Sequence, residues 1–525
     1  MGRFFSSKAV LLVPFTALLT LPAHPPLHMP PWGWVALAPV AWGLAGPGPG
    51  TLGWLGLGWG WGVIFYGLRL EWLPDTLGQK GGIPPETAMG FSAAVVLALG
   101  LFPALAMGVT RWARLRHGLN PLVMFPVLYA LQDALLGVFP FGGVPWGTLA
   151  ATQTDTLAAR WLVPWGSSLL VLAMALGGSA WAAWGSQMVK HPTVKHWAHR
   201  PAWSLFSGGL LLLVTGLVSA PVPATPPPAQ PESPRVVLVP GNLPVGLMAN
   251  PGLAPFQRDD QLARSRAGVE HLRNTNDWRG PVLVVWPESA IAGLPAQGPM
   301  LGELERAAKD MGALVLWGAN GQLTHQGIPR GTNSAWLVGG PAVLRYDKRF
   351  LVAFGEYVPW GFRWMLGRKV TAGDQDDLAG TSPPVLAWGN ERVGVAICQE
   401  STLPLAFAQA AQGTRLVAVL ANDAWLPPRG ASHHLRLSAL RGLETGRPVA
   451  VAANGGYSGV LWRGRPIPLA APTQTGLPAP EPFWLASALP PVENTPWLTW
   501  GYLPLFFMAG LLTLGAWLLR RPPEE

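Results

Sequence analysis

The chain has 525 residues, of which 50% are hydrophobic and only 12% are charged, and its mean hydropathy is +0.28. This composition excludes an ordinary water-soluble globular protein and favours a polytopic membrane protein. The net charge of +9 is compatible with nucleic-acid binding, but the Lys and Arg residues lie in short clusters beside apolar runs, so no nucleic-acid partner is expected. The single cysteine, Cys398, rules out an intramolecular disulfide and a metal site built on paired thiolates.

The first 220 residues contain recurrent apolar runs, judged against the roughly 20 residues that cross a bilayer. They predict a transmembrane domain of about seven helices, near residues 9–23, 32–45, 52–66, 88–110, 121–139, 161–184 and 205–220. The 28 Trp residues support a membrane location, because the indole ring favours the headgroup layer. The first run could instead be a cleaved signal peptide, since Arg3 and Lys8 precede a short apolar core that ends near Ala23.

A Pro-rich linker at residues 221–234 separates these runs from a domain of different texture at residues 235–490. In this domain the apolar runs shorten to strand length and alternate with helix-like segments, which is the pattern of a layered α/β domain. A last apolar run at residues 496–520 ends in a basic pair and predicts a C-terminal transmembrane helix.

Basic clusters close to the ends of spans mark the cytoplasmic side of a membrane. Arg3 and Lys8 place the N-terminus inside, and counting spans forward places three further clusters inside as well. These clusters are Arg111, Arg114 and Arg116, then Lys190, Lys195 and Arg200, and finally Arg520 and Arg521. The α/β domain is therefore predicted on the outer, periplasmic face of a cytoplasmic (inner) membrane.

Three polar residues of the outer domain each follow an apolar strand: Glu288, Lys348 and Cys398. Strand ends are where active sites of α/β sheets gather. The simpler interpretations are that Cys398 is a structural cysteine and that Glu288 and Lys348 form a surface ion pair. Against a structural cysteine, Gln399 and Glu400 directly after it are too polar for a protein core. Lys348 would favour the thiolate of Cys398 and, with the backbone N–H after Cys398, stabilise an oxyanion. Glu288 can carry the thiol proton.

The order Glu, Lys, Cys with these local motifs resembles the nitrilase superfamily, and the apolar runs on both sides make the chain similar to the apolipoprotein N-acyltransferase family. Further segments resemble that family: GGVPWGTLAATQ at 142–153, FGEYVPW at 354–360, NDAW at 422–425, RGLETGRP at 441–448 and AANGGYSG at 452–459. The resemblance implies a polytopic α-helical membrane protein with an inserted α/β nitrilase-like domain, an αββα sandwich.

The resemblance also implies a reaction. An acyl chain would pass from a membrane glycerophospholipid to a thioester on Cys398, and from there to the N-terminal α-amine of diacylglyceryl-cysteine in an exported lipoprotein. It implies Glu288 as general base and acid, Lys348 as oxyanion stabiliser, and supporting roles for Glu356, beside Lys348, and Glu400, in the site loop. A monomer without a metal or cofactor is expected.

Residues that would contact substrate are taken from the same family segments: Trp146, Tyr357, Gln399, Asn422 and Trp425. Gln399 departs from the family, which commonly has an aromatic residue at this position. Asp423, His433 and His434 are assigned no role, since adjacent histidines point to different faces of a helix and do not form a metal site.

Two other functions stay open on the sequence. A membrane-tethered nitrilase-type amidase would use water as the second acceptor, but it gives no reason for eight spans. A transporter or sensor with an outer ligand-binding domain would need charged residues inside the spans. Asp133 is the main residue of that kind.

Overall fold

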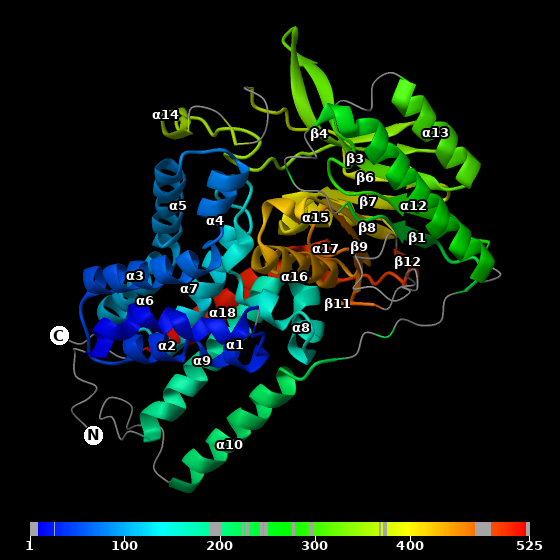
Figure 1. Cartoon of the computed structure of the whole chain (residues 1–525). Coiled ribbons are helices and arrows are strands. Elements are labelled where there is room, and N and C mark those ends of the chain that lie inside the picture. The colour runs from blue at the N-terminus through cyan, green and yellow to red at the C-terminus, as the bar shows by residue number, and fades with distance from the viewer. Residues whose placement is uncertain are drawn as a thin grey trace, which may run out of the picture.

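The computed structural model describes residues 9–25, 27–188, 201–222, 225, 230–241, 245, 250–275, 279–293, 299–366, 369–370, 375–467 and 485–520. The chain forms a helical body and an α/β domain that lie against each other (Figure 1). Some of the residues used above lie outside the described ranges: Arg3, Lys8, Lys190, Lys195, Arg200, Arg521 and part of the Pro-rich linker.

The helical body contains the apolar helices from both ends of the chain. They are η1 (Ala9–Ala23), α1 (Pro30–Val35), α2 (Ala38–Ala45), α3 (Thr51–Arg69), α4 (Leu73–Asp75), α5 (Pro85–Leu99), α6 (Leu101–His117), α7 (Pro121–Leu136), α8 (Leu157–Leu162), α9 (Ser167–Met188), α10 (Pro201–Val218), α17 (Pro496–Trp500) and α18 (Leu503–Leu518). Their shared core packs large side chains from several helices, including Trp54, Trp61, Phe125 and Leu170.

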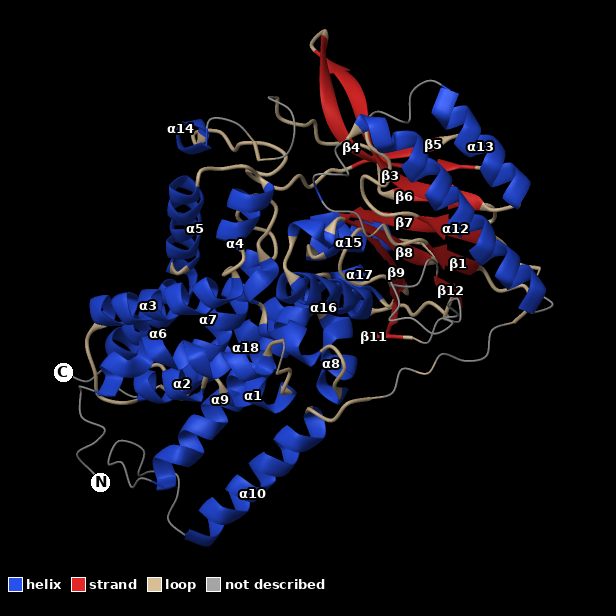
Figure 2. Cartoon of the chain, in the orientation of Figure 1, coloured by secondary structure: helices blue, strands red, loops and turns tan. Residues whose placement is uncertain are grey.

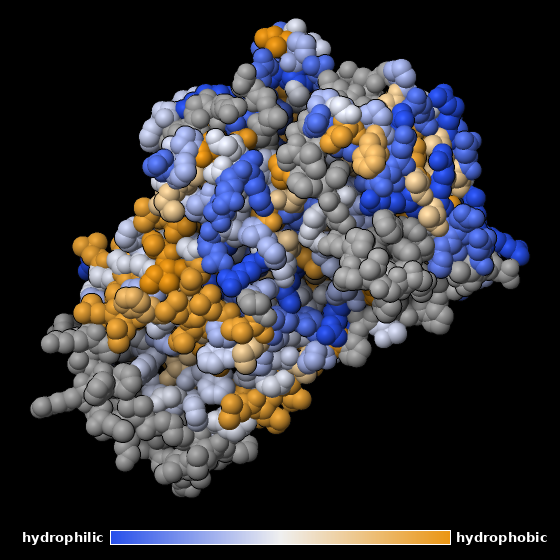
Figure 3. All heavy atoms as spheres, viewed as in Figure 1, coloured by the Kyte–Doolittle hydropathy of each residue, from blue (hydrophilic) through white to orange (hydrophobic). Residues whose placement is uncertain are grey.

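Two helical stretches are long and apolar enough to cross a membrane by length and composition, Pro85–His117 and Ser167–Ser186. Shorter apolar helices occupy Leu11–Ala23, Pro121–Leu136, Ser207–Val218 and Leu503–Leu518. The outer surface of this body is also apolar, as the orange spheres of Figure 3 show. Leu52, Leu212 and Phe507, for example, are 83%, 61% and 66% exposed. A surface of this kind is suited to contact with lipid or another apolar partner.

Three apolar runs that the sequence presents as single spans are divided in the structure, and one of them, at 161–184, is shared between α8 and α9. The run at 32–45 forms α1 and α2, which are separated at Ala36 and Leu37. Pro39 explains the break, because its ring has no N–H to donate and would clash with the carbonyl of Val35 in a continuous helix. The C-terminal run forms α17 and α18, and Gly501 between them has a φ of +52°, a backbone angle that suits glycine.

The α/β domain is built on two six-stranded sheets (Figure 2). The first sheet has the order β12-β1-β2-β3-β4-β5 and the second has the order β11-β10-β9-β8-β7-β6. The strands are β1 (Arg235–Leu238), β2 (Val282–Val285), β3 (Leu314–His325), β4 (Ile328–Val338), β5 (Leu344–Asp347), β6 (Val385–Trp388), β7 (Glu391–Ile397), β8 (Leu416–Ala421), β9 (Val449–Ala453), β10 (Gly459–Trp462), β11 (Arg465–Pro466) and β12 (Leu485–Ala488). Strands β1, β2 and β3 are parallel, as are β7, β8 and β9, and the flanking strands are antiparallel.

Helices cover the outer faces of both sheets. The helices α12 (Ala254–Thr275) and α13 (Pro299–Met311) pack on the first sheet, and α15 (Pro404–Ala411) and α16 (Pro428–Thr445) pack on the second. The inner faces meet through side chains such as Val285, Ile397 and Leu420. Since both faces of each sheet are covered, β2 and β8 are buried at every residue and read as continuous apolar runs. The predicted αββα sandwich is confirmed; a short helix, α14 (Arg363–Leu366), lies outside it.

Helix α16 joins the sandwich to the helical body. Its Leu440 and Leu443 belong to the core of the helical body. Arg441 Nη1 and Glu444 Oε2 form an ion pair of 2.8 Å, and each residue is only 1% exposed. Ser167, the first residue of α9, donates its backbone N–H to Glu444 Oε1 at 2.7 Å and accepts from Arg441 Nη2 at 3.0 Å. The RGLETGRP segment is therefore part of the junction between the two bodies.

Removing one member of this buried pair should cost more stability than removing both. Glu444→Ala leaves the Arg441 guanidinium buried without a counter-ion, and breaking such a pair costs about 3–5 kcal/mol. We expect the double variant Arg441→Leu/Glu444→Leu to lose less, because no uncompensated charge remains. Unfolding of the purified proteins in denaturant, followed by tryptophan fluorescence, measures the free energy of unfolding of both variants. A double variant that is less stable than Glu444→Ala would contradict this account.

Candidate active site

The three strand-end residues come together at one end of the sandwich. Glu288 follows β2, Lys348 directly follows β5, and Cys398 directly follows β7. Because β2 and β5 belong to the first sheet and β7 to the second, the cluster lies between the two sheets. The Cys398 thiol is close enough to the Glu288 carboxyl group to affect its pKa, and Lys348 Nζ lies 3.7 Å from Glu288 Oε1.

The ammonium group of Lys348 is held by two carboxylates. Lys348 Nζ donates to Glu356 Oε1 at 3.0 Å, in addition to the Glu288 contact, although the lysine is only 1% exposed. Asn333 on β4 connects the two acids, since its Nδ2 donates to Glu288 Oε1 at 2.6 Å and to Glu356 Oε1 at 2.7 Å. Four groups thus share one buried polar network, and a change in one of them alters the charge that the others experience.

The electrostatics of the cluster disfavour ionisation of Cys398. Burial raises the pKa of Glu288, against the opposing effect of Lys348. Burial disfavours the Lys348 ammonium, but Glu356 and Glu288 outweigh it and raise the pKa of that lysine. Burial and the Glu288 carboxylate raise the pKa of Cys398 well above its usual value, and Lys348 does not compensate. These effects favour the protonated thiol of Cys398 at rest, and Lys348 acts in the predicted direction without offsetting them.

Left-handed backbone angles occur at or beside the site residues. The φ angles of Cys398, Ser289 and Phe354 are +49°, +52° and +65°. Non-glycine residues in this region cost of order 1–3 kcal/mol each and persist where their surroundings hold them. For Cys398 the angle sets the direction in which the side chain leaves the end of β7.

Glu400 supplies part of what holds the Cys398 loop. Its carboxylate is 2% exposed and accepts four hydrogen bonds, from Tyr346 OH at 2.7 Å and from the backbone N–H groups of Ile397, Arg349 and Phe350 at 2.9, 2.9 and 3.1 Å. Ile397 precedes the cysteine and Arg349 follows the lysine. Glu400 therefore fixes the loop of Cys398 relative to the loop of Lys348.

Two of the predicted substrate contacts lie where the site meets the helical body. Trp146 belongs to a turn of the helical body, and its ring lies over that of His434 with centroids 6.3 Å apart and planes 21° apart. Gln399 reaches the same region, since its Nε2 donates to the carbonyl oxygen of Gly143 at 3.5 Å. Both side chains thus lie between the loop of Cys398 and residues 142–153 of the helical body.

The other three residues predicted to contact substrate form hydrogen bonds with neighbouring loops. The carbonyl oxygen of Tyr357 accepts from Phe354 N at 2.6 Å. Asn422 Oδ1 accepts from the Asn454 side chain at 3.2 Å. The carbonyl oxygen of Trp425 accepts from Thr76 Oγ1 at 2.8 Å, which connects this loop to the helical body.

Two features of the site have no counterpart in the sequence-based prediction. Asn333 carries the bridge between the acids, yet it is one polar residue in a strand and forms no motif. His434 lies behind the nucleophile: its Nδ1 is 2.7 Å from Asp423 Oδ1, and its Nε2 is 3.0 Å from Ser401 Oγ and 3.3 Å from the Cys398 carbonyl oxygen. Asp423 and His434 were assigned no role from the sequence, and only the fold shows that they are buried and meet.

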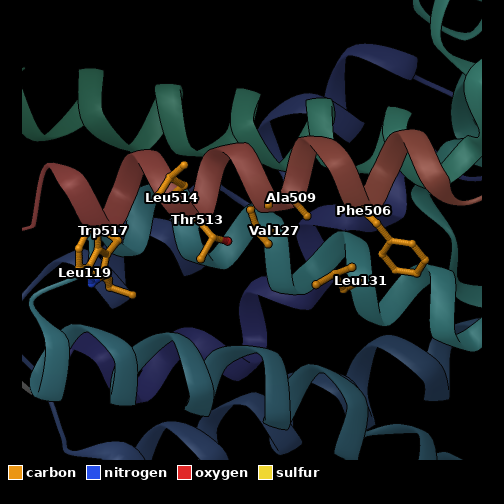
Figure 4. Close-up of a pocket in the computed structure, with 9 residues that line it drawn as sticks. Leu119, Val127, Leu131, Phe506, Ala509, Thr513, Leu514 and Trp517 are labelled. Carbon is orange, nitrogen blue, oxygen red and sulfur yellow. The ribbon is translucent and has the colours of Figure 1, made fainter.

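An apolar groove of about 560 Å³ lies away from this cluster, on the helical body. Figure 4 shows that it runs between α7 and α18. Its lining is almost entirely hydrophobic: Leu119, Val127, Leu131, Phe506, Ala509, Gly510, Thr513, Leu514 and Trp517. Such a lining suits an alkyl chain rather than a polar ligand.

Comparison with protein families gives one match in each body. Residues 16–181 match the apolipoprotein N-acyltransferase N-terminal domain, and residues 267–465 match the carbon-nitrogen hydrolase family. Among curated relatives, the apolipoprotein N-acyltransferase of Photobacterium profundum is 26% identical over 99% of this chain and 96% of its own length. That of Geobacter metallireducens is 27% identical over 86% of this chain and 84% of its own.

Solved structures resemble the α/β domain more distantly. An amidase from Nesterenkonia has 18% sequence identity and a TM-score of 0.31, covering 50% of this chain and 92% of its own. A CN-hydrolase superfamily protein from Xanthomonas campestris has 22% identity and a TM-score of 0.31, covering 44% of this chain and 84% of its own.

The raised pKa of Cys398 predicts a slow, pH-dependent reaction with iodoacetamide. Only the thiolate reacts, so the alkylation rate should rise about tenfold per pH unit from pH 7 to pH 9 without reaching a plateau. Because the protein has one cysteine, the mass of the intact protein reports this site alone. Free glutathione provides the reference for an unperturbed thiol. A plateau near neutral pH would show a preformed thiolate and contradict the assignment.

Proposed function

Because the chain belongs to the apolipoprotein N-acyltransferase family of the nitrilase superfamily, we propose that it completes the acylation of lipoproteins in a membrane. An acyl chain passes from a glycerophospholipid to Cys398, and then to the N-terminal α-amine of a diacylglyceryl-cysteine. The observation that carries the proposal is the cluster of buried Glu288 and Lys348 with half-buried Cys398, placed where the sandwich meets the helical body.

In the first step the Cys398 sulfur attacks the ester carbonyl of the phospholipid. Glu288 takes the thiol proton, and its raised pKa suits a group that must accept a proton and release it again. The oxyanion of the tetrahedral intermediate is stabilised by the Lys348 ammonium and the backbone N–H of Gln399. When the C–O bond breaks, Glu288 returns the proton to the leaving alkoxide. The products are a thioester on Cys398 and a lysophospholipid.

In the second step the α-amine of the lipoprotein attacks the thioester. Glu288 takes a proton from the nitrogen, and the same oxyanion stabilisation applies. The C–S bond breaks, the proton returns to the Cys398 sulfur, and the product is an amide. Resting thiol and unprotonated carboxylate are restored, so one site serves both steps in a ping-pong sequence.

The remaining polar residues act through the three reacting groups. Glu356 orients the Lys348 ammonium at 3.0 Å and is itself held by the backbone N–H of Val352 at 2.7 Å. Asn333 keeps the two carboxylates in position. Trp146 and Gln399 are proposed to contact the acyl chain or the acceptor as it enters from the helical body. Tyr357, Asn422 and Trp425 are proposed for the outer part of the same entrance.

We propose that the helical body spans the cytoplasmic membrane with the sandwich on its outer face. Arg111 donates to the carbonyls of Gly46, Gly48 and Pro49, which supports a common face for the end of α6 and the end of α2. The end of α18 packs near α6 through Ala516 and Ala113. The sandwich contacts the opposite ends of the helices, where Lys80 Nζ donates to Ala424 O at 2.7 Å. Arg111 and the site thus lie at opposite ends of the helices, which supports this orientation.

A membrane location also suits the chemistry. A long acyl chain is insoluble in water and a thioester is open to hydrolysis, so an active site that faces a bilayer receives its donor directly and limits water. The apolar groove between α7 and α18 is a second place on the helical body that suits an alkyl chain. The helices are then part of the enzyme and not only an anchor.

Intact-mass spectrometry tests the first step directly. After incubation with a defined phospholipid, the wild-type protein should gain the mass of one acyl group, and Cys398→Ala should gain none. Adding a diacylglyceryl peptide should remove the adduct and acylate the peptide. Glu288→Gln should form the adduct about 10²–10⁴-fold more slowly, because it cannot accept the thiol proton.

The control is that Cys398→Ala keeps the unfolding midpoint of the wild type. A folded wild-type protein that gives no adduct with several phospholipids would argue against acyl transfer, and amide substrates would then be tested. Full acyl transfer by Cys398→Ala would remove Cys398 from the mechanism.

The proposed topology predicts which cysteines a membrane-impermeant reagent can reach. In a Cys398→Ala background, Leu519→Cys beside Arg520 should label only after the cells are opened. Thr324→Cys, on the exposed β3–β4 hairpin of the sandwich, should label in cells whose outer barrier alone is permeable. Labelling of Leu519→Cys in those intact cells would overturn the orientation.

A further inference from the structure

A buried histidine contacts the peptide group that follows the nucleophile. His434 on α16 is 4% exposed, and its Nε2 lies 3.3 Å from the carbonyl oxygen of Cys398. Its Nδ1 lies 2.7 Å from Asp423 Oδ1, and Asp423 is also 4% exposed. The ring cannot turn, because Trp146 lies over it and both of its nitrogens have partners. No step proposed above uses this histidine.

The carbonyl of Cys398 and the N–H of Gln399 belong to one peptide group. That group is planar and trans, so its C=O and N–H bonds point in opposite directions. A contact that fixes the carbonyl oxygen therefore fixes the direction of the N–H. This N–H is the backbone donor assigned to the oxyanion.

The hydrogen-bond roles follow from the partners. A carbonyl oxygen can only accept, so His434 must carry a proton on Nε2 to bond it, and Asp423 accepts the proton on Nδ1. Nε2 also lies 3.0 Å from Ser401 Oγ, and that hydroxyl accepts a hydrogen bond from Ser438 Oγ at 2.8 Å. Burial disfavours the doubly protonated ring, but the Asp423 carboxylate outweighs it and raises the pKa of His434.

We propose that His434, held by Asp423, is a positioning residue that aims the backbone N–H of Gln399 at the oxyanion. The inference rests on the proposed acyl transfer through Cys398. It assigns no proton transfer to the histidine. The peptide group after Cys398 opens a short 3-10 helix over Cys398–Ser401, and His434 contacts its carbonyl oxygen from the far side of the loop.

Two reactions of the Cys398 sulfur distinguish this positioning role of His434 from a purely structural role in supporting the loop. Acylation of Cys398 builds an oxyanion, whereas alkylation by iodoacetamide does not. We expect His434→Leu to slow acylation about 10- to 100-fold, somewhat less than the loss of a whole oxyanion donor, and to leave the alkylation rate unchanged. His434→Gln should recover much of the loss, since its amide N–H can donate to the same carbonyl. Asp423→Asn, which keeps the shape of the side chain, should slow acylation in the same direction.

Acylation is measured with two donors, a defined phospholipid by intact mass and p-nitrophenyl butyrate by the burst of p-nitrophenolate. If the wild type reacts with the nitrophenyl ester but not with the phospholipid, the proposed function fails and the effect of His434 is still measured. Equal losses in acylation and alkylation, or no loss in acylation, would overturn the inference, as would a wild type that neither donor acylates. Should His434→Leu not fold, Asp423→Asn and His434→Gln decide the matter.

Discussion

The burial of the Lys348 ammonium is the constraint on which the site depends. Removing such an ion from water costs several kcal/mol even after the protein relaxes, so the fold must supply partners for it. Glu356 and Glu288 are those partners, and Asn333 holds both of them with one amide nitrogen. Two carboxylates against one ammonium leave one negative charge. Burial first, and the Glu288 carboxyl group second, raise the pKa of Cys398 and keep its proton in place, and burial also raises the pKa of Glu288, the group that receives the proton.

The same reasoning applies at the junction between the sandwich and the helical body. Arg441 and Glu444 are as deeply buried as Lys348, and they are tolerated because they pair with each other and with Ser167. Helix α16 carries this junction and also His434, which contacts the nucleophile loop. One rigid helix thus sets the position of Cys398 relative to the helical body. An acyl chain that enters from the helices therefore meets a nucleophile whose place is fixed.

Local patterns in the sequence predict a large part of this arrangement and miss what depends on long-range contacts. Continuous apolar runs such as β2 and β8 predict strands covered on both faces, and the polar residues after the strands predict Glu288, Lys348 and Cys398 as neighbours. Asn333 was not predictable, because its importance arises from two carboxylates that reach it from distant segments. The raised pKa of Cys398 was not predictable for a related reason: a lysine neighbour can be inferred from a motif, whereas the degree of burial cannot.

The boundary between the two bodies also accounts for the unusual residue at 399. Gly143 on the helical side has a φ of +126°, and a Cβ there would lie 2.4 Å from the carbonyl oxygen of Gly137, so this position requires glycine. The wall of the entrance is consequently bare backbone at this point. Gln399 on the opposite side offers a side-chain amide, which can bond that backbone carbonyl. A phenylalanine ring at 399 could pack on the glycine but could not donate a hydrogen bond to this carbonyl. Gln399 therefore links the nucleophile loop to the helical body by a hydrogen bond, at the position where the family commonly has an aromatic residue.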